Sequence, residues 1–71
     1  MRVEIGQLRV WVRPDHPRDL GKPFLITGPG PEPGPGEPVV EDTWSFVIDG
    51  KREWHFDDVI SRDSEVVSEA G

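Results

Sequence analysis

The sequence predicts an all-β fold, a small five-stranded barrel, and two observations carry most of this prediction. Several short segments alternate apolar with polar residues, which is the period of a half-buried strand. Eight prolines and eight glycines interrupt any long helix between these segments. A chain of 71 residues buries only about 60% of the surface that it exposes when unfolded. We therefore expect one domain over residues 1–71, closed because an open sheet of this size would expose its edges.

The first strand is expected at residues 8–13, where the side chains alternate in character. One face carries Leu8, Val10 and Val12, and the other carries Arg9, Trp11 and Arg13. Since side chains along a strand point alternately to its two faces, this pattern predicts that Trp11 points away from the core. Val3 and Ile5 have the opposite parity, so a turn or bulge at Gly6 is expected to bring them onto the core face.

The next segments predict a turn, a second strand and a long loop. Residues 14–21 contain two prolines and are typical of a turn, and residues 22–27 predict a strand in which Phe24 and Ile26 share a face. Residues 28–38 consist of five prolines, four glycines and two glutamates. Proline removes backbone donors and glycine adds chain freedom, so this segment is expected to be an exposed loop with polyproline II character.

The strongest local signal is a β-hairpin at residues 44–56, where two alternating segments flank an Asp-Gly pair. A two-residue loop would place Trp44 opposite His55 and mix the two faces. A three-residue loop over 48–50 places Trp44 opposite Trp54, and the sequence favours it because the large aromatic side chains then share one face. We therefore expect Trp54 to lie in the core.

The C-terminal part predicts a turn and a last strand. Residues 57–61 are expected to form a turn or a single 3₁₀ turn, and residues 64–68 a short strand. The alternative is a helix over residues 58–70, which the β-branched residues and serines of this segment disfavour.

The opening pattern Val3-x-Ile5-Gly6-x-Leu8-x-Val10 is followed by the hairpin at 44–56 and by the turn at 57–61. This order resembles the small Src-homology-3-like barrels found in many uncharacterised bacterial and phage proteins, which place a distal hairpin and a 3₁₀ turn in the corresponding positions. The resemblance implies a barrel fold and a binding role, and it brings no catalytic residue to this chain. It also makes a phage accessory or virion protein the expected setting.

Charge and composition exclude several classes of function. The chain has 14 acidic and 8 basic residues and a net charge of −6, divided into +2 over residues 1–31 and −8 over residues 32–71. Nucleic acids and anionic membranes both attract Lys and Arg, so we expect neither as a partner. The absence of cysteine excludes disulfides and thiolate metal sites, and we expect no cofactor. No apolar run is long enough for a membrane helix or a signal peptide, which favours a cytoplasmic or virion-associated protein.

Two groups of residues are candidates for protein binding. An outward Trp11 between two arginines has the composition of an interface hot spot. The alternatives are that Trp11 packs under the loop at 28–38, covers the open end of the barrel, or stacks against a flanking arginine. The second group consists of acids that would face a basic partner. Together the candidate binding residues are Arg9, Trp11, Arg13, Glu41, Asp42, Asp57 and Asp58.

The sequence contains no arrangement that predicts catalysis. None of its serines has the context of a nucleophile elbow, and the row of Glu53, His55 and Asp57 is typical of a solvated strand face rather than a metal site. We therefore expect a non-enzymatic protein-binding or structural module that docks on a protein partner, either a second copy or a foreign protein. The alternative is a small acidic inhibitor that covers a basic surface of another protein.

Overall fold

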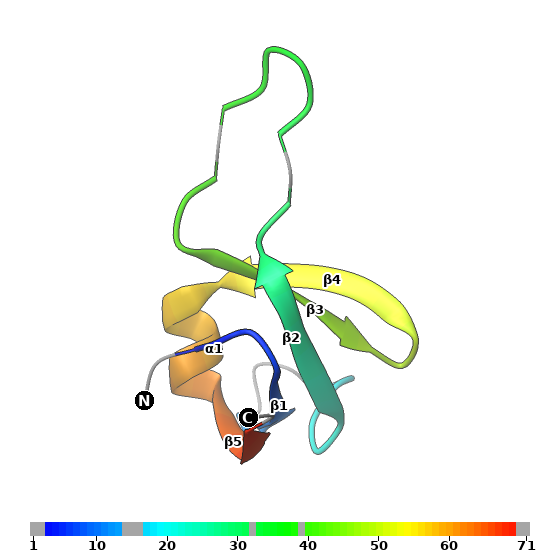
Figure 1. Cartoon of the computed structure of the whole chain (residues 1–71). Helices are drawn as coiled ribbons and strands as arrows, with labels where there is room; N and C mark the ends of the chain where they lie inside the picture. The colour runs from blue at the N-terminus through cyan, green and yellow to red at the C-terminus, as the bar shows by residue number, and fades with distance from the viewer. Residues whose placement is uncertain (1–2, 14–16, 32, 39, 70–71) are drawn as a thin grey trace.

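The computed structural model describes residues 3–13, 17–31, 33–38 and 40–69 (Figure 1). Within these residues five antiparallel strands form one sheet in the order β4-β3-β2-β1-β5, with one short helix. The elements are β1 (Gln7–Trp11), β2 (Pro23–Pro29), β3 (Thr43–Ile48), β4 (Lys51–Phe56), α1 (Asp57–Asp63) and β5 (Ser64–Glu69). The predicted all-β class is confirmed. The expected closure is not complete, because α1 joins β4 to β5 and these two strands form the open edges of the sheet.

Strand β1 turns its large side chains to the face opposite the predicted one. Trp11 is 1% exposed and Arg9 is 2% exposed, whereas Val12 is 41% exposed. The Trp11 ring stacks on Phe24 at a centroid distance of 4.6 Å and meets Phe46 edge-on at 5.9 Å. A stacked aromatic cluster buries more apolar surface than three small aliphatic side chains would, which explains the reversed parity.

The turn expected at Gly6 is present, with φ of 91°. It brings Val3 into the core, but Ile5 remains exposed. Only one of the two apolar residues before the turn therefore joins the core face.

Strand β2 confirms the second predicted strand and extends it by two residues. Phe24 and Ile26 are buried on the same face, as expected. Because Gly28 and Pro29 form the end of β2, the loop begins two residues later than predicted. The described residues of this loop project away from the sheet (Figure 1). Of the turn expected before β2, residues 17–21 contain turns, and residues 14–16 lie outside the described residues.

The hairpin of β3 and β4 is confirmed, but its register is the two-residue alternative. Trp44 lies opposite His55. Asp49 and Gly50 have φ of 51° and 74°, which is typical of the type I′ turn that matches the twist of the flanking strands. The preference of the Asp-Gly pair for this turn outweighs the segregation of aromatic side chains onto one face. The prediction that Trp54 lies in the core is consequently wrong.

The C-terminal strand is confirmed as β5, but the segment before it is a seven-residue α-helix rather than a 3₁₀ turn. Asp57 and Asp58 lie in the first turn of α1 and Arg62 in the last, which complements the helix dipole. The alternative helix over 58–70 is wrong beyond Asp63. Among the described residues the hydrophobic core comes from both halves of the chain and consists of Val3, Trp11, Phe24, Ile26, Phe46, Ile48 and Ile60.

Gly30 lies where β2 leaves the sheet, and its N–H donates to the Thr43 carbonyl at 3.0 Å. A Cβ atom at Gly30 would lie 1.7 Å from Thr43 Oγ1 and 2.5 Å from Thr43 Cβ. Since Cβ is fixed to the backbone, the two strand ends would have to separate. We expect Gly30→Ala to lower the free energy of unfolding by about 1–3 kcal/mol in urea denaturation. Gly28→Ala is the matched control, because nothing lies within 4 Å of the added methyl group. Equal costs for the two variants would contradict the close contact.

Candidate interaction surface

Strand β4 has a neighbour on one side only among the described strands. The backbone of Lys51 pairs with Ile48 across the turn, and hydrogen-bonded pairs recur at every second residue of an antiparallel ladder. Asp57 N–H donates to the Asp42 carbonyl at 2.7 Å, so the same alternation of hydrogen-bonded residues continues beyond the end of β4. The N–H and C=O groups of the intervening residues therefore point away from β3. These residues are Arg52, Trp54 and Phe56.

The same three residues carry the side chains of the outer face of β4. Trp54 is 44% exposed and Phe56 is 45% exposed, and their rings meet edge-on at a centroid distance of 5.7 Å. His55, which points to the opposite face, lies 6.2 Å from the Trp11 ring. The packing of His55 against the core thus fixes the two aromatic side chains on the outside.

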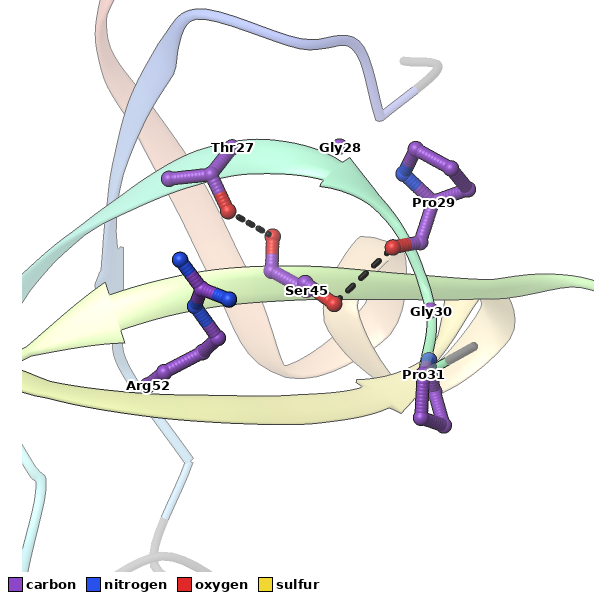
Figure 2. A pocket seen from close by; sticks show the side chains of 7 residues that line it. All are labelled: Thr27, Gly28, Pro29, Gly30, Pro31, Ser45 and Arg52. Carbon is purple, nitrogen blue, oxygen red and sulfur yellow. Dashed lines mark hydrogen bonds between the residues drawn. The ribbon is translucent and has the colours of Figure 1, made fainter. Parts of the chain in front are cut away.

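A shallow groove of about 550 Å³ lies on the outer face of the sheet (Figure 2). One of its lining residues, Ser45, lies opposite Trp54 in the hairpin. The end of β2 forms one wall, and Ser45 and Arg52 contribute from β3 and β4. Ser45 Oγ donates to the Pro29 carbonyl at 2.9 Å, and Thr27 Oγ1 donates to the Ser45 carbonyl at 3.2 Å. Both hydroxyl groups bond to the backbone, so the charge among the residues that line the groove is that of the Arg52 guanidinium.

The tip of the hairpin is tied to the start of β2 by an ion pair. Lys22 Nζ lies 2.6 Å from Asp49 Oδ2. The hydrogen bond to Asp49 and its negative charge raise the pKa of Lys22. Both side chains are exposed, so this contact orients the tip and adds little stability.

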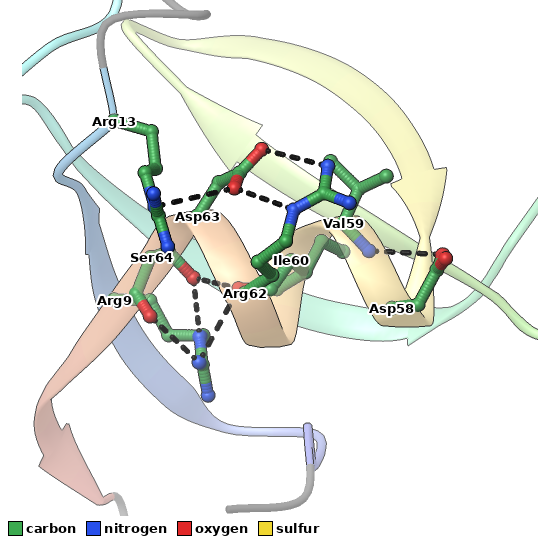
Figure 3. Close-up of polar contacts among 8 residues, drawn as sticks. All are labelled: Arg9, Arg13, Asp58, Val59, Ile60, Arg62, Asp63 and Ser64. Atoms are coloured by element: carbon green, nitrogen blue, oxygen red, sulfur yellow. Dashed lines mark hydrogen bonds and ion pairs between the residues drawn. The ribbon is translucent and has the colours of Figure 1, made fainter.

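The structure places Arg9 and Trp11, two of the predicted binding residues, inside the protein. Arg9 Nε donates to Ser64 Oγ at 2.8 Å and Nη1 donates to Gln7 Oε1 at 2.9 Å, while Nη2 lies 3.2 Å from the Ser64 carbonyl and 3.4 Å from the Ile60 carbonyl (Figure 3). Burial lowers the pKa of the Arg9 guanidinium, and the charge of Asp57 opposes this shift. The prediction of an outward hot spot at Trp11 is wrong, and Arg9 holds β1 against the C-terminal part of the chain instead.

Arg13 is exposed, as predicted, and faces a buried carboxylate. Its Nε lies 3.7 Å from Asp63 Oδ1. Arg62 approaches the same carboxylate, with Nε 2.9 Å from Oδ1 and Nη2 3.3 Å from Oδ2 (Figure 3). Arg13 therefore belongs to a cluster that neutralises Asp63 at the end of α1.

The structure brings two of the four predicted acids together. Asp42 and Asp57 line a groove of about 340 Å³ beside Trp44. Asp57 Oδ1 accepts a hydrogen bond from Trp44 Nε1 at 2.8 Å, so its charge is partly used within the protein. Asp58 Oδ1 accepts from the Val59 N–H at 2.9 Å, and Glu41 is exposed in the loop before β3.

Sequence reasoning missed the outer face of β4. The signal was present, because a two-residue Asp-Gly turn puts Trp54 and Phe56 on the face opposite Trp44. Among the described residues no group of three or more potential ligand side chains is arranged to hold a metal ion. Within the same residues no helix has the length and apolar character needed to span a membrane.

Comparison with known proteins gives no match to a protein-family model, to a curated protein or to a solved structure. Function must therefore be inferred from the side chains and the backbone of this chain.

Proposed function

We propose that the protein is a non-enzymatic module that binds a protein partner along strand β4. The observation that carries this proposal is the coincidence of an unpaired strand edge with two half-exposed aromatic side chains, Trp54 and Phe56. An extended segment of a partner adds to such an edge through backbone hydrogen bonds, and side chains on alternate residues give specificity.

The composition of this surface supports the proposal. Trp and Arg are enriched among the residues that contribute most to protein–protein affinity, and Trp54 and Arg52 share one face of β4. The groove beside them offers room for a side chain of the partner and a guanidinium for a carboxylate or a carbonyl group. Natural edge strands usually carry charges or prolines that discourage pairing. Strand β4 carries charges at Lys51, Arg52 and Glu53, and it also exposes two aromatic rings.

The resemblance to small phage and bacterial barrels extends this proposal to its setting. We place the module in a phage or phage-like assembly, as an accessory or virion component in the cytoplasm or the particle. The alternative function, an acidic inhibitor, needs carboxylates gathered on one exposed face. It has weaker support, because Asp63 is buried between two arginines and Asp57 bonds to Trp44.

A selection of extended peptides tests the proposed function. A random peptide library displayed on yeast is screened with the labelled wild-type protein. We expect the selected peptides to bind Trp54→Thr at least about tenfold more weakly than the wild type, because threonine keeps strand propensity and removes the aromatic contact. Val67→Thr, an exposed position on the other edge strand, is the matched control and should bind as the wild type does.

Hydrogen exchange of the complex locates the contact. The amides of Arg52 and Trp54 should become protected when a selected peptide binds. A screen without binders, or peptides that bind both variants equally and protect β5 instead, would contradict the proposal.

A further inference from the structure

We infer that the partner of β4 is β4 of a second copy of this chain, paired antiparallel with Trp54 opposite Trp54 on a two-fold axis. This inference rests on the proposed function and names the occupant of the same surface. It follows from the phase of the backbone groups, from the charges of the strand and from the exposed aromatic rings.

The backbone phase restricts the pairing. The outward N–H and C=O groups belong to Arg52, Trp54 and Phe56, so these residues must lie opposite one another in the two copies. In a two-fold antiparallel pair one residue, the centre, lies on the axis opposite its own copy. The centre can then be any one of five residues, from Arg52 to Phe56. In each of them the outer faces of the two copies join into one continuous face.

The charges on β4 and at the start of α1 disfavour three of these centres. A centre at Arg52 places two guanidinium groups opposite each other, and a centre at Glu53 does the same with two carboxylates. A centre at His55 puts Glu53 opposite Asp57 of the other copy. Like charges directly opposite each other destabilise a pair of strands. A centre at Phe56 leaves half of β4 without a partner.

When the two-fold axis passes through Trp54, every pair of opposed residues is compatible. The two Trp54 rings lie opposite each other, Arg52 lies opposite the Phe56 ring, and Glu53 lies opposite His55. Aromatic pairs and cation–π pairs stabilise neighbouring strands, and no like charges lie opposite each other at this centre. In the isolated chain the Phe56 N–H donates to its neighbour His55 Nδ1 at 2.9 Å, and pairing would replace this bond with one to the Arg52 carbonyl of the second copy. The result is a ten-stranded sheet continuous across the axis.

Sedimentation equilibrium over a range of concentrations and salt measures the association. We expect the mass to rise from 8.0 kDa towards twice that value as concentration increases. Each copy carries a net charge of −6, so screening by salt should leave the dimer at least as stable. A dimer joined through the +2 and −8 halves of the chain would instead dissociate in salt, and this result would overturn the inference. A mass of 8.0 kDa at every concentration would overturn it as well.

Trp54→Pro tests the edge itself. The N–H of Trp54 points away from β3, so proline removes a donor from the free edge and none from the hairpin ladder. We expect its dimer to be at least about tenfold weaker than that of the wild type, and weaker than that of Trp54→Thr, which retains the N–H. Equal association of the wild type and Trp54→Pro would overturn the inference.

Cysteine cross-linking tests the register and remains informative if the proline variant fails to fold. The chain has no cysteine, so a disulfide can form only at an introduced position. Opposed residues of a hydrogen-bonded pair lie about 5.5 Å apart between Cα atoms, within the range that a disulfide spans. Trp54→Cys should therefore form a covalent dimer in a glutathione buffer. Arg52→Cys and Phe56→Cys should cross-link only when they are mixed.

The results separate this inference from the proposed function. Peptides that bind β4 of a protein that stays monomeric would overturn the second copy as partner and leave the binding role intact. Self-association that neither Trp54 variant weakens, together with a peptide screen that yields no binders, would overturn both this inference and the proposed function. Cross-linking of Arg52→Cys with itself would place the axis at Arg52 and overturn the pairing that we infer, while the binding role of β4 would stand.

Discussion

Replacing Trp11 with alanine should lower the free energy of unfolding by about 3–5 kcal/mol, the cost of deleting a large aromatic side chain from a packed core. Trp11 is buried, stacks on Phe24 and contacts Phe46, and its packed surroundings should fill only part of the space that it leaves. A chain of 71 residues is stabilised by roughly 4–10 kcal/mol in total. The variant should consequently lose a large part of its stability and unfold at a lower temperature and a lower urea concentration than the wild type.

Trp54→Ala is the matched control for this prediction. Its ring is 44% exposed and contacts Phe56 on the outside of the sheet, so the expected cost is about 1 kcal/mol or less. Urea denaturation followed by far-ultraviolet circular dichroism compares the two variants without depending on tryptophan fluorescence. A larger loss for Trp54→Ala than for Trp11→Ala would contradict the core described here.

The strand segments could be predicted because they depend on local alternation and on breaks at glycine and proline. Phe24 and Ile26 share a buried face, and the strand at 64–68 exists, because each pattern is complete within a few residues. The helix at Asp57–Asp63 could not be predicted in the same way. Two of its seven residues are β-branched, and such residues have a low helix propensity. Packing of Ile60 into the core stabilises the helix more than local propensity does.

The local pattern predicts the wrong face for two strands, for related reasons. In β1 the alternation predicts that the aliphatic residues point inward, whereas the structure buries Arg9, which donates to acceptors more than fifty residues away and to one on the same strand. Such a network joins distant segments and has no signature in a local pattern. In β4 the turn chemistry of Asp49-Gly50 overrides the grouping of aromatic side chains. Because both faces are reversed, the exposed tryptophan is Trp54 and the buried one is Trp11.

The second large effect is expected at Arg9, which links β1 to the junction of α1 and β5. Its guanidinium donates to four acceptors on three residues: Gln7, Ile60 and Ser64. Hydrogen bonds to a charged group contribute more than neutral ones, and leaving their acceptors buried without a donor carries a further penalty. Relief of the buried charge in a methionine variant offsets part of this loss. We expect Arg9→Met to lower the free energy of unfolding by about 2–4 kcal/mol.

Arg9→Lys separates the charge of Arg9 from its geometry. An ammonium group keeps the positive charge but cannot direct donors to Gln7 and Ser64 at once, so a cost close to that of Arg9→Met is expected. Arg13→Met is the control for loss of an exposed arginine, and it should cost about 1 kcal/mol or less, because Asp63 retains Arg62. Urea denaturation of the three variants shows whether the charge of Arg9 or the geometry of its hydrogen bonds contributes more to the free energy of unfolding. Wild-type stability in Arg9→Lys would mean that the charge beside Asp57, rather than the fork of hydrogen bonds, holds the C-terminal strand against β1.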